Sequence, residues 1–145
     1  LSIILLLGLI FYFKVDILTP SSVVAKGLGA SSVLVPTERG EINLLPQHTH
    51  LMAKLDTGVL RLEDNGGKEK LFFITKGVCK VLKDKITILT AAGEEDCDIS
   101  FSRAQKSLEE SKLKLESTEV FQDGEREELE EKSRRARTRL EIIKK

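Results

Sequence analysis

The chain contains two histidines, His48 and His50, which lie one residue apart just after a proline. On an extended segment this spacing places both imidazoles on one side, where they could ligate a metal ion. A Zn²⁺ site needs three or four protein ligands, and no cysteine or carboxylate cluster lies nearby in the sequence. Catalysis would need a nucleophile or an acid–base partner, and no motif supplies one. We therefore expect neither a metal site nor a catalytic site, and interpret His48 as part of a proline-fixed corner beside Leu45.

The two cysteines do not form a recognisable metal or redox motif either. Cys79 and Cys97 are far apart and form no C-x-x-C motif. Without the dense cysteine spacing of a disulfide scaffold, this usage is typical of reduced thiols in a cytosolic compartment. A single disulfide between them is the alternative.

Charged side chains offer a third kind of chemistry. Lys+Arg and Asp+Glu both total 23, so the net charge is zero, and no global field attracts nucleic acid or an acidic membrane. Locally, the stretch from residue 125 to residue 145 places acids first and bases last, which suits a helix dipole. Its basic part still leaves a strongly positive surface, for which an acidic partner is the natural complement. The residues concerned are Arg134, Arg135, Arg137 and Arg139.

These residues must be positioned by secondary structure, and most of the chain has the pattern of short β-strands. Phe13, Val15 and Ile17 alternate with polar residues, as expected for a half-buried strand. Gly27, Gly29 and Pro36 punctuate the runs that follow, and residues 64–67 and 83–85 favour tight turns. The run 71–74 is apolar throughout, as in a strand buried on both faces. Strands spaced about eight to ten residues apart predict an antiparallel β-sandwich over residues 13–93.

The period changes to that of helices over residues 97–145. Asp98 or Ser100 is the candidate N-cap of a first helix, whose apolar stripe is interrupted by Ser111. Residues 117–124 form a connector, and a second helix follows. The expected buried positions are Phe101, Ala104, Leu108 and Leu115 on the first helix, and Leu129, Ala136, Leu140 and Ile143 on the second. Because these stripes are thin, we expect a helical hairpin of marginal docking stability, able to adopt two arrangements.

Residues 1–12 form a hydrophobic N-terminal extension. With Phe13 it would span about 20 Å as a helix, against roughly 30 Å for a membrane core. It has no basic n-region and no small-residue cleavage site. We interpret the extension as the product of an over-extended reading frame rather than a native segment; a short membrane-dipping anchor is the alternative.

Five segments occur in a specific order: FKVDILTP at 13–20, GEI followed by LPQH at 40–48, GVLRL at 58–62, FITKGVCKV at 73–81, and RRARTRLE at 134–141. In this order, together with the β-then-α architecture, the chain resembles the epsilon subunit of the F-type ATP synthase. The resemblance covers nearly all of the chain from Phe13 onwards.

The resemblance implies a non-catalytic central-stalk (rotor) subunit of a proton-translocating complex. Such a subunit links gamma to the c ring through the sandwich and regulates ATP hydrolysis through its C-terminal helices. It implies that Glu41 and Ile42 contact the c ring from a loop, and that the corner of Leu45, Pro46 and His48 is structural or contacts gamma. It implies that the four arginines contact the catalytic beta subunits, and that the beta and alpha subunits are partners together with gamma and the c ring. The expected location is peripheral, on the cytoplasmic face of a bacterial inner membrane, with the chloroplast thylakoid membrane as the alternative.

Two departures from the family pattern affect the expected ligands. Family members that bind ATP carry an I-D-x-x-R-A motif, and here Ser100 replaces its carboxylate. We therefore expect no cofactor, with Arg103 as the only candidate for a weak nucleotide contact. Gln47, Thr49 and His50 also differ from the family, and His50 has no assigned role. The alternative function is a free-standing β-sandwich that binds a ligand or a metal and carries a helical oligomerisation tail.

Overall fold

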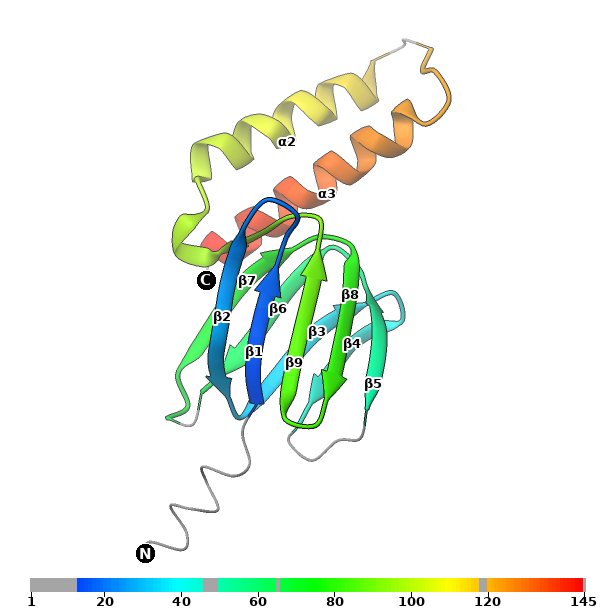
Figure 1. The fold of residues 1–145 in the computed structure, drawn as a ribbon. Helices are drawn as coiled ribbons and strands as arrows, with labels where there is room; N and C mark the ends of the chain where they lie inside the picture. Colours follow the sequence, from blue (N-terminus) through cyan, green and yellow to red (C-terminus); the bar gives the residue numbers. More distant parts are fainter. Residues whose placement is uncertain (1–12, 46–49, 65, 118–119, 145) are drawn as a thin grey trace, which may run out of the picture. The chain divides into compact units, whose positions relative to one another are not determined.

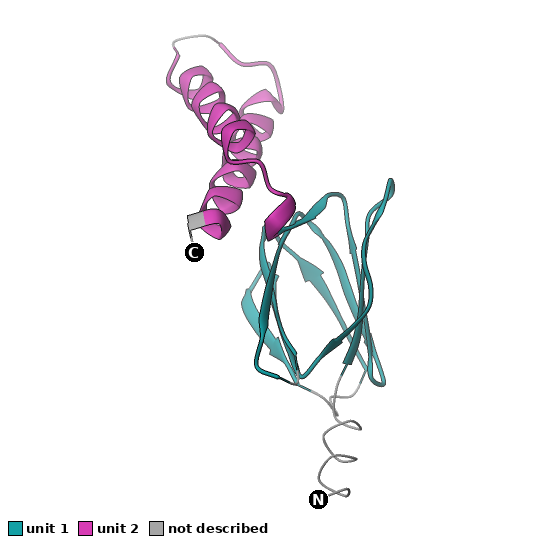
Figure 2. Ribbon diagram, turned by 90° about the vertical axis from the view of Figure 1, so that its left-hand side faces the viewer, with its two compact units in different colours: residues 1–95 teal, residues 96–145 magenta. Residues whose placement is uncertain are grey.

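The computed structural model describes residues 13–45, 50–64, 66–117 and 120–144 (Figure 1). The chain forms two compact units, one ending at Glu95 and one beginning at Asp96 (Figure 2). The sequence pattern predicts that the first unit ends at residue 93 and that the second begins at residue 97.

The first unit is a β-sandwich with ten strands among its described residues, folded into two layers (Figure 1). Nine strands follow one another along a hydrogen-bonded path, and β4 pairs with β3 beside that path. The layers are linked where Thr37 of β3 pairs with Leu55 of β5. The layer that we call the front sheet contains β2 (Val23–Ala30), β1 (Phe13–Leu18), β9 (Lys85–Thr90), β8 (Gly77–Leu82) and β5 (Leu51–Leu55). The layer that we call the rear sheet contains β10 (Gly93–Glu95), β7 (Glu69–Ile74), β6 (Gly58–Glu63), β3 (Ser32–Thr37) and β4 (Gly40–Leu44).

Alternating side chains from both layers fill the space between them. Phe13, Val15 and Ile17 are all 0% exposed, which confirms the alternation predicted for this strand. In β7 the aromatic Phe72 joins the same core, and all four residues from 71 to 74 are buried. An uninterrupted apolar run in β7 is therefore buried on both faces, as predicted.

Two details of the sandwich differ from the sequence prediction. The pair β1–β9 is parallel, whereas alternation alone carries no information on strand direction. Gly27 and Gly29 lie inside β2 rather than between strands. The β1–β2 register shifts between Val15 and Ile17, and Gly27 has a φ of 66°. This geometry is a β-bulge, in which glycine tolerates the positive φ without breaking the strand.

The predicted turns are present. The Asp64 carboxylate accepts hydrogen bonds from the backbone N–H of Gly66 at 2.9 Å and of Lys68 at 2.8 Å, and so closes the β6–β7 hairpin. Lys83, with a φ of 55°, occupies the β8–β9 turn. At Gly77 a Cβ would lie 2.0 Å from the Leu89 carbonyl oxygen, so this position requires glycine.

The second unit contains the short 3-10 helix η1 (Asp96–Asp98), α2 (Phe101–Glu116) and α3 (Glu125–Lys144). Of the two candidate N-caps, the structure selects Ser100, whose Oγ accepts the Arg103 backbone N–H at 3.4 Å. Asp98 instead ends η1. The two long helices pack against each other.

The buried face of this unit is built from smaller residues than predicted. Phe101 is 52% exposed, whereas Ser111, the predicted interruption of the apolar stripe, is 1% exposed. Its hydroxyl donates to the Ser107 carbonyl at 2.7 Å, so burial leaves no unsatisfied polar group. On α3, Ser133 and Ala136 are 1% and 0% exposed. The buried aliphatic residues of α3 are Leu129, Leu140 and Ile142, with Ile143 only partly buried.

Candidate functional site

The first candidate site is the β3–β4 hairpin, which was expected to contact a partner. Its turn is Glu38–Arg39, and Glu41 is the second residue of the edge strand β4 rather than part of a loop. Thr37 fixes the turn, because its hydroxyl donates to the Gly40 carbonyl and accepts from the Arg39 N–H. Glu41 is exposed and Ile42 is 36% exposed. The tip of this hairpin therefore presents charged residues beside one accessible aliphatic side chain.

The corner after β4 is only partly visible. Leu45 is 47% exposed, while Pro46 and His48 lie outside the described residues, as do Gln47 and Thr49. His50 is described and exposed. Among the described residues, His50 belongs to no group of three side chains that could hold a metal ion.

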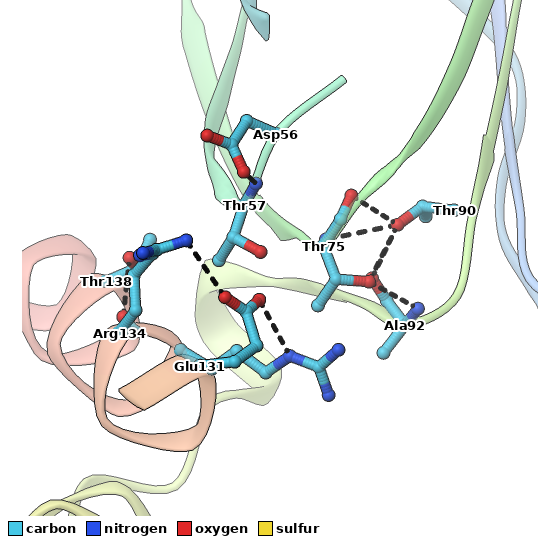
Figure 3. A network of polar contacts seen from close by, with 9 residues as sticks. Asp56, Thr57, Thr75, Thr90, Ala92, Glu131, Arg134 and Thr138 are labelled. Atoms are coloured by element: carbon cyan, nitrogen blue, oxygen red, sulfur yellow. Dashed lines mark hydrogen bonds and ion pairs between the residues drawn. The ribbon is translucent and has the colours of Figure 1, made fainter. Parts of the chain in front are cut away.

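The four arginines of α3 do not form one surface. Arg134 and Arg135 both bind Glu131 of the same helix, at 3.0 Å and 3.3 Å (Figure 3). Arg137 is exposed and donates to the Ser133 hydroxyl at 2.9 Å. Arg139 is partly buried. Glu131, which belongs to the acidic part of α3, thus neutralises part of the positive charge for which the sequence predicts an external partner.

Arg135 and Arg139 line an open groove of about 640 Å³ between α2 and α3. The groove contains as many acids as bases; its walls are Ser107, Glu127, Glu128, Glu131, Lys132, Arg135 and Arg139. Arg103, the candidate nucleotide contact, is exposed in the first turn of α2 and is not part of these walls. Carboxylates in such a groove oppose binding of a polyphosphate.

The polar groups at one end of the sandwich are structural. The hydroxyls of Thr75 and Thr90 lie 3.1 Å apart, Thr90 donates to the Thr75 carbonyl at 2.8 Å, and the Ala92 N–H donates to Thr75 at 2.9 Å (Figure 3). Both threonines are buried. This network ties the end of β7 in the rear sheet to the end of β9 in the front sheet. Sequence reasoning missed this network, because the two threonines meet only through the topology of the sandwich.

One further polar site was missed by sequence reasoning. Asp16 lies on the outer side of β1 and is 8% exposed. It accepts the N–H of Gly27 in the β2 bulge at 2.8 Å and lies 3.4 Å from Lys85. The Gly27 hydrogen bond and the Lys85 charge lower the pKa of Asp16.

Among the helices of the described residues, none is long and apolar enough to cross a membrane.

Comparison with known proteins identifies the family. A family model described as "ATP synthase, Delta/Epsilon chain, beta-sandwich domain" matches residues 12–96. The ATP synthase epsilon chain of Desulfosudis oleivorans is 35% identical over 104 residues, which are 72% of this chain and 77% of that one. The epsilon chain of Persephonella marina is 32% identical over 130 residues, 90% of this chain and 95% of that one. The chloroplastic epsilon chain of Pinus koraiensis is 34% identical over 113 residues, which are 77% of this chain and 79% of that one.

Solved structures share the fold. A chain of the Euglena gracilis mitochondrial ATP synthase, solved with OSCP, F1 and the c-ring, superposes with a TM-score of 0.66 and 22% identity, covering 92% of this chain and 78% of that one. Since the sandwich model covers more than half of the residues and the epsilon relatives extend over both units, the chain belongs to the ATP synthase delta/epsilon family and is an epsilon-type member of it.

Proposed function

We propose that the chain is a non-catalytic central-stalk subunit of a proton-translocating F-type ATP synthase. In this role the sandwich links gamma to the c ring, and the C-terminal helices regulate ATP hydrolysis. The observation that carries the proposal is that a protein named ATP synthase epsilon chain aligns with 90% of this chain, across the sandwich and both helices. The free-standing module with an oligomerisation tail is not favoured, because those relatives share the whole architecture and not the sandwich alone.

The exposed β3–β4 hairpin is the proposed contact with the c ring. Glu41 and Ile42 are accessible at its tip, and a short hairpin on a rigid sandwich can transmit torque without unfolding. Leu45, together with Pro46 and His48 in sequence, forms the proposed corner toward gamma.

The C-terminal helices are the proposed regulatory element. The buried face of this hairpin contains the small residues Ser111, Ser133 and Ala136, each of which contributes less to the free energy of docking than a leucine would. Such an element can change arrangement at low cost. Arg134 and Arg137 are exposed, although Arg134 is paired with Glu131, and acidic segments of the catalytic subunits would be the complement of their positive charge.

The regulatory role can be tested by reversing those two charges. The Arg134→Glu/Arg137→Glu variant is expected to relieve inhibition of ATP hydrolysis several-fold in a reconstituted complex, because both variant side chains would repel acidic segments. The Lys112→Glu/Lys114→Glu variant changes the charge equally on exposed positions of α2 and is the control. Equal hydrolysis by the wild-type and Arg134→Glu/Arg137→Glu complexes, with the subunit bound in both, would contradict the proposal.

The remaining assignments follow from this role. The chemistry of ATP takes place in other subunits, so the chain itself is not an enzyme. We propose that it needs no cofactor, which is supported by the balanced charges of the groove and by the exposed position of Arg103. Relatives come from bacteria and chloroplasts, and the proposed location is the cytoplasmic face of a bacterial inner membrane, with the thylakoid membrane as the alternative.

A further inference from the structure

A small pocket opens between the two sheets of the sandwich, where the end of β2 meets the β6–β7 hairpin (Figure 1). Its volume is about 200 Å³, and it shares no residue with the β3–β4 hairpin tip or with the groove between α2 and α3. Since a water molecule takes up roughly 30 Å³, the pocket has room for about six or seven groups of that size. Its walls are Leu28, Gly29, Leu62, Asp64, Lys68 and Lys70.

Hydrogen bonds hold the walls of this pocket in place. At the β2–β3 corner the Ser31 N–H donates to the Glu63 carbonyl at 2.7 Å, and the Ser31 hydroxyl lies 3.1 Å from the carbonyls of both Glu63 and Asp64. In the hairpin, the Asp64 N–H donates to the Lys68 carbonyl at 2.9 Å, and the Asp64 carboxylate accepts the Lys68 N–H at 2.8 Å. The backbone around the pocket is therefore fixed before a ligand enters, which lowers the cost of binding.

The floor of the pocket is aliphatic. Leu62 is 3% exposed and belongs to the core of the sandwich. Leu28 is partly buried and packs against that core. Gly29 adds no side chain between them. An aliphatic chain that enters the pocket would therefore leave water for an apolar surface, and this transfer favours binding.

Lys70 occupies an unusual position for a charged residue. Register places it opposite the core residue Leu62, so it lies on the inner face of the rear sheet. Glu63 and Glu69, which are also opposite each other, lie on the outer face of that sheet. Inner faces of a sandwich normally supply the apolar core. The front sheet follows this rule, since its alternating burial places on the outer face Lys14, Lys54 and Lys80.

The charges of the pocket leave an excess of one positive charge, from two lysines and one aspartate. Among the ion pairs of the described residues, none includes Lys68 or Lys70. The carboxylate of Asp64 is already used by the N–H groups of Gly66 and Lys68. Because the aspartate would repel a highly charged anion, the pocket suits a single negative charge better than a polyphosphate.

We propose that this pocket binds a small amphiphile with one negative charge. Its aliphatic chain, of about seven carbons by the volume of the pocket, contacts Leu28 and Leu62. Its head, a carboxylate or a similar monoanion, is held by Lys68 and Lys70. A free carboxylic acid and the head of an anionic membrane lipid share this chemistry. The proposal goes beyond the central-stalk role and does not depend on it.

Titration of the full chain with sodium octanoate, followed by amide NMR, tests the pocket. The signals of Leu28, Gly29, Lys68 and Lys70 are expected to shift and to saturate with a dissociation constant at or below about 1 mM. Propanoate, which has the same head and a short chain, is expected to bind at least ten-fold more weakly. Octylammonium, which has the same chain and the opposite charge, is expected to give no saturable shift there. Octanoate shifts that do not saturate by about 10 mM, or that are equally large throughout the sandwich, would overturn the proposal.

A charge-neutralising variant tests the role of the two lysines. Lys68→Gln/Lys70→Gln keeps the backbone hydrogen bonds of the hairpin and is expected to bind octanoate at least ten-fold more weakly. Lys76→Gln/Lys80→Gln makes the same charge change at exposed positions outside the pocket and should stay within about two-fold of wild type. Circular dichroism on each protein checks the fold, and the single variant Lys68→Gln, at an exposed position, replaces the double variant if that one unfolds. Equal affinity of the wild-type and lysine-pocket variants for octanoate would overturn the proposal.

Vesicles separate the two sources of the anion. Cosedimentation of the wild-type chain with phosphatidylglycerol vesicles, lost in Lys68→Gln/Lys70→Gln and kept in Lys76→Gln/Lys80→Gln, would support the pocket and assign its ligand to a membrane lipid. Octanoate binding without cosedimentation would support the pocket and assign its ligand to a free carboxylate. Binding of neither probe would overturn the proposal. The proposed function is judged separately, by whether the wild-type chain joins the complex.

Discussion

Asp16 shows how one side chain holds an irregular strand in place. The bulge in β2 turns the Gly27 N–H away from the normal ladder, and a neutral acceptor could satisfy it. A carboxylate makes a stronger, charge-assisted bond, and Asp16 provides one at 2.8 Å. Lys85 adds little, since its side chain is 62% exposed and exposed ion pairs are weak.

The Asp16→Asn variant should therefore be less stable by roughly 1 kcal/mol at neutral pH, because the amide keeps a hydrogen bond but loses the charge. The native pKa lies below the ordinary value of 3.8, so the carboxylate stabilises the fold above that value. This contribution is lost as the pH falls through the native pKa. Urea unfolding from pH 7 to pH 2 should show the difference between the two proteins shrinking below about pH 4. A difference that persists unchanged to pH 2 would mean that the charge is not the cause.

The two cysteines differ in reactivity for a related reason. Cys79 is 0% exposed, and burial raises its pKa to about 11. Cys97 is exposed and forms no disulfide with Cys79. Because the thiolate is the reactive form, one equivalent of thiol should react quickly with Ellman's reagent at pH 8 in the native protein. The second should react only after unfolding, and the Cys97→Ser variant should lose the fast phase. A fast phase in that variant would show that Cys79 is accessible.

Several of the buried side chains of helices α2 and α3 are small. Ser111 and Ala104 are the buried residues of α2, and Ser133 and Ala136 are buried on α3. Small side chains let two helices approach each other, yet each contributes less than a leucine would. The interface therefore depends on fit more than on area.

An enlarged side chain at this interface tests that view. Ala136→Leu should destabilise the helical unit by about 1 to 3 kcal/mol, since overpacking forces neighbours from their rotamers. The thermal transition of the helical signal at 222 nm should move to lower temperature. Lys112→Leu, an exposed change on α2, is the matched control and should leave the transition in place. If Ala136→Leu raised the transition temperature, the interface would contain unfilled space.

The strands and helices could be predicted from the sequence where a local pattern specifies them. The alternation of Phe13, Val15 and Ile17, the turn at Asp64 and the Ser100 cap are local, and all appear in the structure. The β2 bulge was missed because Gly27 looks like a loop residue until its partner across the sheet, Asp16, is known. The Thr75–Thr90 network was missed for the same reason, since the fold of the sandwich brings together residues that no local pattern connects.

At the scale of the whole molecule, the two units should differ in their dependence on each other. All ten strands and the Thr75–Thr90 network lie before Asp96. A chain ending at Glu95 should therefore fold, with a cooperative thermal transition and dispersed amide NMR signals. A fragment that lacked these signals would show that the sandwich requires the helices.

The net charge of zero conceals a separation of charge across the sandwich. Lysines cover the outer face of the front sheet, and glutamates are prominent on that of the rear sheet, as the strand registers show. Such a distribution gives the sandwich an electric dipole, which the zero net charge of the whole chain does not reveal. In the electric field of a charged assembly a dipole experiences a torque. The subunit would therefore be oriented toward its binding site before contact is made. Its association rate should then fall with ionic strength as it does for a charged protein, a behaviour that the amino-acid composition alone would not suggest.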